Sequence, residues 1–155
     1  MLKFYVPDKN PARSSSRLRA FIPAENYGKV ISNIDDIEDG DVVVFSKKSS
    51  IPEIKYVVDR NIKFIFDICD DQFKDPVYVN LFKYACSNCH VITVPSQKMK
   101  ELVEHHTNKK VFVTLELYER NRKPPKFSPI DALKILFFGS VDNFSTVPWK
   151  DIVNG

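Results

Sequence analysis

The 155-residue sequence lacks any apolar run close to the roughly 18–20 residues that a transmembrane helix needs. Its N-terminus, MLKFYVPDKNPAR, turns polar too soon for a signal peptide. Cysteine is scarce as well, because the three cysteines are an odd number that fits a reduced compartment better than a disulfide framework. These absences predict a cytoplasmic protein without a membrane span.

No charge of one sign dominates. The 23 basic and 20 acidic residues give a net charge of +3, which is too balanced for a nucleic-acid-binding protein with its basic stripe. Basic residues do gather locally. Such clusters either belong to an ordinary solvated surface, or they contact a phosphate-rich ligand or the surface of an anionic membrane. The clusters are Arg13, Arg17 and Arg19; Lys109 and Lys110; and Arg120, Arg122 and Lys123.

Strong catalytic signatures are missing too. The sequence contains no Ser-His-Asp order, HExxH motif or Walker loop. The segment CSNCH, residues 86–90, fits the pattern for haem attachment, and Cys69 could join its cysteines in a zinc site. Small buried cysteines explain the segment adequately, so we predict neither a metal nor a cofactor.

What the sequence does contain is an alternation of short apolar runs with longer amphipathic stretches. Runs such as VVVF and IKFIF are apolar throughout, which suits a parallel sheet covered on both faces. We therefore predict an α/β fold, a three-layer α/β/α Rossmann-like domain with a mostly parallel sheet of about six or seven strands. The predicted strands cover residues 2–6, 30–32, 42–46, 62–68, 91–95, 111–115 and 133–138, and the predicted helices cover residues 16–26, 51–61, 75–87 and 96–106.

A change of composition after residue 118 predicts a domain boundary. The segment YERNRKPPKFSPID has the proline and charge content of a linker. We predict a Rossmann-like domain over residues 1–118, a linker over 119–132, and an orphan strand and tail over 133–155. That strand, from Leu133 to Phe138, would be a sticky edge if left unpaired, so we expect it to join the sheet or to pair with another copy in a homodimer.

Candidate ligand-binding residues follow the first predicted strand. In open α/β sheets, ligands bind beyond the carboxyl ends of the strands. The loop there ends in SSSRLR, where backbone N–H groups and serine hydroxyls could bind an anion, although helix capping accounts for at least one serine. The loop has no glycine and so lacks the dinucleotide-binding signature. The predicted substrate-binding residues are Ser14, Ser15, Ser16, Arg17 and Arg19.

Three carboxylates follow the fourth predicted strand, in the segment FDICDD. Because carboxylates are costly to desolvate, they should face solvent or a polar cleft. They could bind sugar hydroxyls, hold a cation or act as a base; the alternative is a turn followed by a helix cap. We favour Asp67 and Asp70 as catalytic residues and assign Asp71 to substrate binding.

Three stretches, taken in order, resemble GT-B glycosyltransferases of the large retaining family that includes sucrose and glycogen synthases. SSRLRAFIPA (residues 15–24) resembles their first loop and helix, and IFDICDD (65–71) resembles their "YDIDDD" strand end. ACSNCHVITVPS (85–96), continued by MKEL (99–102), resembles their "A-D-x-V-T-V-S-T-x-x-L-A-x-x-L" segment. LKILFFGS (133–140) is similar to the strand that opens their C-terminal domain.

The resemblance implies the half of a two-domain enzyme that binds the sugar or glycoconjugate acceptor, with residues 14–19, Asp67 and Asp70 lining the cleft. The family's nucleotide-sugar donor residues, including paired glutamates, lie in the other half, and no glutamate follows Glu119 here. We therefore expect part of a glycosyltransferase, inactive alone, that meets a donor only with a missing C-terminal domain; it is a truncated enzyme, a gene remnant or half of a split enzyme. The alternatives are a non-catalytic carbohydrate-binding or protein-interaction module, and another Rossmann-like binder of nucleotides or phosphorylated ligands.

Overall fold

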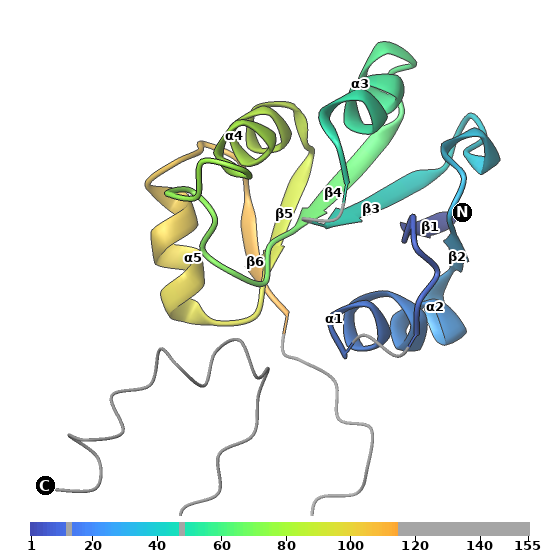
Figure 1. Ribbon diagram of the computed structural model, residues 1–155, viewed down its shortest axis with the longest axis horizontal. Helices are drawn as coiled ribbons and strands as arrows, with labels where there is room; N and C mark the ends of the chain where they lie inside the picture. The colour runs from blue at the N-terminus through green and yellow to red at the C-terminus, as the bar shows by residue number, and fades with distance from the viewer. Residues whose placement is uncertain (12–13, 47–48, 115–155) are drawn as a thin grey trace, which may run out of the picture. The chain divides into compact units, whose positions relative to one another are not determined.

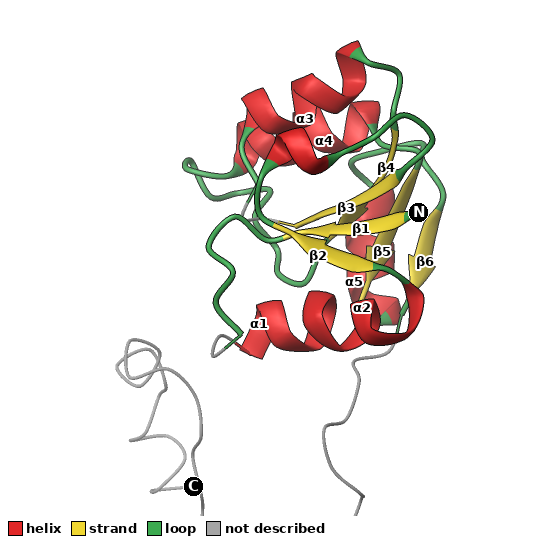
Figure 2. Ribbon diagram, turned by 90° about the vertical axis from the view of Figure 1, so that its right-hand side faces the viewer, coloured by secondary structure: helices red, strands yellow, loops and turns green. Residues whose placement is uncertain are grey.

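The computed structural model describes residues 1–11, 14–46 and 49–114 of the chain. This part forms one parallel sheet in the strand order β2-β1-β3-β4-β5-β6, with helices on both faces (Figures 1 and 2). The predicted α/β Rossmann-like fold is therefore confirmed. The strands are β1 (Leu2–Tyr5), β2 (Lys29–Ile31), β3 (Val42–Ser46), β4 (Lys63–Asp67), β5 (Val91–Val94) and β6 (Val111–Val113).

The helices lie where amphipathic patterns separate the strands. Helices α1 (Ser14–Ser16) and α2 (Ile22–Tyr27) are joined by a π-helical turn over Arg17–Phe21 and lie between β1 and β2. A 3-10 turn, Ile34–Asp36, lies between β2 and β3. The remaining helices are α3 (Ile51–Asp59), α4 (Val79–Asn88) and α5 (Gln97–Glu104).

The winding direction of the sheet reverses between β1 and β3. The chain moves from β1 outward to β2, returns past β1 to β3, and then proceeds in the other direction to β6. Because parallel crossovers are right-handed, the first step places α1 and α2 on one face, and the later steps place α3 and α4 on the other, as Figure 2 shows. The carboxyl ends of β1 and β3 therefore form the switch point at which such sheets bind ligands.

Two separate hydrophobic clusters hold these layers together. The larger one packs α3, α4 and α5 against strands β3 to β6, with Phe45, Phe64 and Phe66 almost fully buried. The smaller one packs Ala20 and Ala24 against Phe4 and Val6 on the opposite face. The described helices of that opposite face thus cover β1, while Ile65 and Thr93 of β4 and β5 are only partly buried and Phe112 of β6 is 52% exposed. Among the residues that the structure describes, helices therefore cover both faces of the sheet at β1, while the second face of β4 to β6 is partly exposed.

Local chemistry explains where the helices begin and end. The side chain of Ser96 accepts a hydrogen bond from Met99 N–H at 3.2 Å, and Ser50 forms a capping box with Glu53. Helix α3 ends two residues before its predicted end, because Asn61 adopts a left-handed conformation with φ of 54°. Helix α4 begins later than predicted, because Asp75 accepts from Val77 N–H at 2.8 Å and forms a turn there instead.

Pro23 does not end its helix, although a proline within a helical pattern usually ends or bends it. In the preceding π-helical turn, Ile22 N–H donates to the carbonyl of Arg17, five residues back. Pro23 then falls in the first turn of α2, where a missing N–H costs nothing. After α2, Gly28 permits a close approach to β1, since a Cβ there would meet the Leu2 carbonyl oxygen at 2.1 Å.

The described part of the chain, outside the gaps at 12–13 and 47–48, has no helix with the length and apolarity to cross a membrane. The predicted linker over 119–132 and the predicted pairing strand over 133–138 lie outside the described residues.

Candidate functional site

The site centres on an ion pair between two residues far apart in the sequence. Arg19, in the π-helical turn, donates from Nε and Nη2 to the two carboxylate oxygens of Asp67, the last residue of β4. Both side chains are largely buried, at 11% and 7% exposed. A bidentate pair of this kind is geometrically specific as well as strong. The pair therefore joins the first loop and helix to the end of the fourth strand.

Thr93 completes the arrangement from the neighbouring strand. Its Oγ1 donates to Asp67 Oδ1 at 2.6 Å, and the two residues are register partners in the pairing of β4 with β5. Asp67 is thus held by Arg19 and Thr93 together. A carboxylate whose two oxygens are already engaged is better placed to orient a ligand than to take a proton from one.

A small cavity of about 30 Å³ lies beside this pair, at the carboxyl ends of β1, β3 and β4. A space of this size accommodates water rather than a sugar ring. Tyr5 lines it and donates its hydroxyl to Glu53 of α3. Burial first, then the hydrogen bond and the charge of Glu53, raise the pKa of Tyr5 above its ordinary value. The other polar side chains that line the cavity with Tyr5 are those of Ser15, Ser16, Arg19, Ser46, Asp67 and Cys69.

A larger groove of about 300 Å³ reaches the same ion pair. Its lining combines residues of the helical segment with residues of the partly buried sheet face described above. Arg19, Asp67, Phe4 and Val44 line both spaces. The other lining residues of the groove are Leu2, Leu18, Pro23, Tyr27, Ile65, Thr93 and Thr114.

The predicted site residues are only partly brought together. Of the serines, Ser15 and Ser16 line the small cavity, while the side chain of Ser14 lies outside the described parts. Arg17, in the π-helical turn, donates to the carbonyl of Pro11 in the preceding loop at 3.0 Å and lines neither space.

The two aspartates after Asp67 also line neither space. Asp70 accepts from the Cys69 thiol at 3.4 Å. Asp71 is exposed and accepts from Phe73 N–H at 3.1 Å, which is the turn that the sequence offered as its alternative role.

Sequence reasoning missed Thr93. Its signal was available, because Thr93 and Asp67 stand at corresponding positions near the carboxyl ends of consecutive parallel strands. Parallel neighbours bring such positions to one edge of the sheet. Reading the strand ends against one another, rather than one at a time, would have placed this hydroxyl beside the carboxylate.

The CSNCH segment lies away from this site, at the end of α4 and the start of β5. Cys86 and Cys89 are buried in the larger hydrophobic cluster. Burial raises the pKa of Cys86 to about 12 and that of Cys89 to about 11. Both thiols therefore stay protonated near neutral pH in the metal-free protein. In the part of the chain that the structure describes, no three acidic, histidine or cysteine side chains are grouped to hold a metal ion.

Comparison of the chain with protein-family models, curated proteins and solved structures finds no match.

Proposed function

We propose that this chain is the acceptor-binding domain of a glycosyltransferase of GT-B type. In this role, it holds a sugar or glycoconjugate at the Arg19–Asp67–Thr93 site and transfers nothing without a separate domain that binds the nucleotide-sugar donor. One observation carries the proposal: Arg19 and Asp67 meet beside the switch point of the sheet. These residues come from two of the stretches on which the family resemblance rests.

The charge balance of the site supports an uncharged, hydroxyl-bearing ligand. Arg19 and Asp67 neutralise each other, so the pair offers little net attraction to a phosphate. Side by side, however, a guanidinium and a carboxylate present a hydrogen-bond donor group and an acceptor group in fixed positions. Sugar hydroxyls both donate and accept, and they match such a surface.

The same balance argues for a divided enzyme. Sugar transfer requires stabilisation of the departing donor phosphate by positive charge or oriented dipoles. Arg19, the arginine of this site, is already paired with a carboxylate. We therefore assign donor binding and leaving-group stabilisation to a partner domain.

The test is an NMR titration of the full chain with methyl β-glucoside, maltose and UDP-glucose. We expect the two saccharides to bind in the millimolar range and to shift the backbone signals of Thr93 and Arg19. UDP-glucose should bind no tighter than they do. Micromolar binding of UDP-glucose by this chain would contradict the proposed division of labour.

Thr93→Val removes the hydroxyl that orients Asp67 while it preserves the shape of the side chain. Losing this hydrogen bond should weaken saccharide binding roughly 5- to 10-fold. Thr107→Val is the matched control, because Thr107 also donates through its hydroxyl, to the Cys86 carbonyl at 3.3 Å, but lines neither cavity. Equal saccharide affinities in the two variants would show that the saccharides do not bind at the Arg19–Asp67–Thr93 site.

A further inference from the structure

The two spaces that reach the Arg19–Asp67 pair differ in volume, at about 30 Å³ and about 300 Å³. The smaller one has room only for water. The larger one lies at the lower end of the range of small-molecule sites. A ligand that contacts Asp67 must therefore approach it through the groove.

Apart from the ion pair, Thr93, Thr114 and the Tyr27 hydroxyl, the groove is lined by apolar side chains. Along its helical side it is lined by Leu18, Pro23 and Tyr27, and the Tyr27 side chain is prominently exposed, with the residue 74% accessible. Along the sheet it is lined by the partly buried Ile65. A short polar ligand held at the ion pair would leave much of this apolar surface in contact with water, which is unfavourable.

We propose that the groove binds an alkyl or aryl group, so that the acceptor is a glycoside or polyol with an apolar aglycone. The assignment of the hydroxyl-bearing end to the Arg19–Asp67–Thr93 site rests on the function proposed above. The aglycone lies along the apolar lining and the hydroxyl end reaches Asp67. Arg19 and Asp67 cancel in charge, so the ligand end that meets them is neutral.

The aglycone should account for most of the affinity. Each methylene that is fully buried raises the binding constant by up to about fourfold. Octyl β-glucoside should therefore bind at least about 10-fold tighter than methyl β-glucoside, even if only a few of its methylenes are buried. The hydroxyl end should matter too, so octyl β-glucoside should also bind more tightly than 1-octanol.

The experiment measures binding of these three probes to the full chain by calorimetry and NMR, with octyl β-glucoside kept below its micelle concentration. A blocking variant, Thr114→Trp, places a large ring in the groove at an exposed position whose backbone N–H stays bonded to Val94. Lys110→Trp is the matched control: Lys110 is exposed and directly precedes the start of β6, whereas Thr114 directly follows its end. We expect Thr114→Trp to weaken octyl β-glucoside at least about 10-fold and Lys110→Trp to leave it unchanged.

The outcomes separate the two proposals. If octyl and methyl β-glucosides bind equally and Thr114→Trp affects neither, the groove assignment is overturned while the proposed function stands. If 1-octanol binds and is blocked by Thr114→Trp but neither glucoside binds more tightly than it, the apolar groove is supported and the proposed function fails. If light scattering shows a dimer that Thr114→Trp dissociates, the groove is an interface between copies and the ligand assignment is overturned.

Discussion

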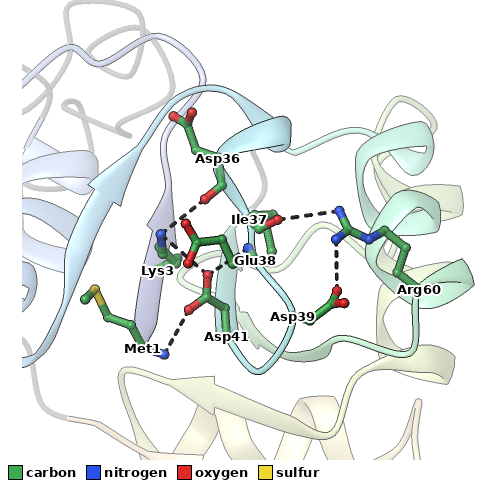
Figure 3. A network of polar contacts seen from close by, with 8 residues as sticks. All are labelled: Met1, Lys3, Asp36, Ile37, Glu38, Asp39, Asp41 and Arg60. Atoms are coloured by element: carbon green, nitrogen blue, oxygen red, sulfur yellow. Dashed lines mark hydrogen bonds and ion pairs between the residues drawn. The ribbon is translucent and has the colours of Figure 1, made fainter.

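Asp41 lies at the amino ends of the parallel strands (the amino edge of the sheet), and Asp67 lies at their carboxyl ends (the carboxyl edge). The two are almost equally buried, with side chains 5% and 7% exposed. Asp67 ends β4 and pairs with Arg19. Asp41 precedes β3 and accepts hydrogen bonds from the amino group of Met1 at 2.8 Å and from Glu38 N–H at 2.9 Å. Lys3 Nζ lies 3.5 Å from the Asp41 oxygen that accepts from Glu38 N–H (Figure 3). Each edge thus holds a buried carboxylate beside a cation.

The difference between them lies in the surrounding space. Asp67 lines both the small cavity and the groove, whereas Asp41 lines neither. The partners of Asp41 belong to the start of β1 and to the segment between β2 and β3, so these contacts hold the two segments together. Lys3 adds to them, because it also donates to the Asp36 carbonyl at 3.1 Å. A buried ion pair by itself therefore does not indicate a ligand site; of these two pairs, Arg19–Asp67 is the one that also lines open volume beside the switch point.

The largest expected effect on stability comes from removing the cation that pairs with Asp67. Arg19→Met should lower the free energy of unfolding by about 3–5 kcal/mol, because it leaves a buried charge without its partner. The double variant Arg19→Met/Asp67→Leu should regain most of that loss, since it removes both charges. Urea unfolding of the two variants and the wild type measures this. A double variant as unstable as the single one would mean that the pair itself, rather than the cost of isolating Asp67, stabilises the fold.

A smaller effect, about 2 kcal/mol, is expected at the amino edge from Asp41→Asn, which leaves buried donors without a charged acceptor. Burial by itself would raise the pKa of Asp41, but hydrogen bonds from the Met1 amino group and Glu38 N–H, and the charge of Lys3, outweigh it and lower that pKa. The contribution of Asp41 is therefore fully present above the unfolded-state pKa of about 3.9 and is lost as the pH falls through the lower folded value.

The pH dependence of unfolding separates this variant from a general loss of stability. Between the wild type and Asp41→Asn, the difference in unfolding free energy should shrink as the pH falls below about 4. A difference that stays constant down to pH 2 would show that the charge of Asp41 contributes nothing to folding.

The smallest effect changes reactivity rather than stability. Cys69 is partly exposed and lines the small cavity at the carboxyl edge, while Cys86 and Cys89 are buried near the start of β5 with raised pKa values. At pH 8, a disulfide reagent should modify one thiol rapidly and the other two only as fast as the protein unfolds. In Cys69→Ser, the rapid phase should disappear. Rapid modification of a second thiol would mean that the amino edge opens more readily than its burial indicates.

The sheet could be predicted because its physical cause lies within each strand: runs such as VVVF are apolar on both faces and separated by helical patterns. The positions of Arg19 and Asp67 at the carboxyl edge followed from the same reasoning. Their mutual pairing could not be predicted, because it depends on the rotation of the first helical segment about its axis. That rotation decides whether the Arg19 side chain faces β4. Asp71 was assigned to substrate binding, while its observed contact is a local turn within three residues of sequence.

The π-helical turn over Arg17–Phe21 gives the helix one residue more in that turn than a regular α-helix has. One residue corresponds to about 100° of rotation around a helix axis. Losing a residue there would swing the guanidinium of Arg19 away from β4, or else carry Pro23 to another position around the axis. The angular phase of a single short helix thus decides whether the two halves of this site meet, and an insertion or deletion of one residue would separate them more surely than most substitutions.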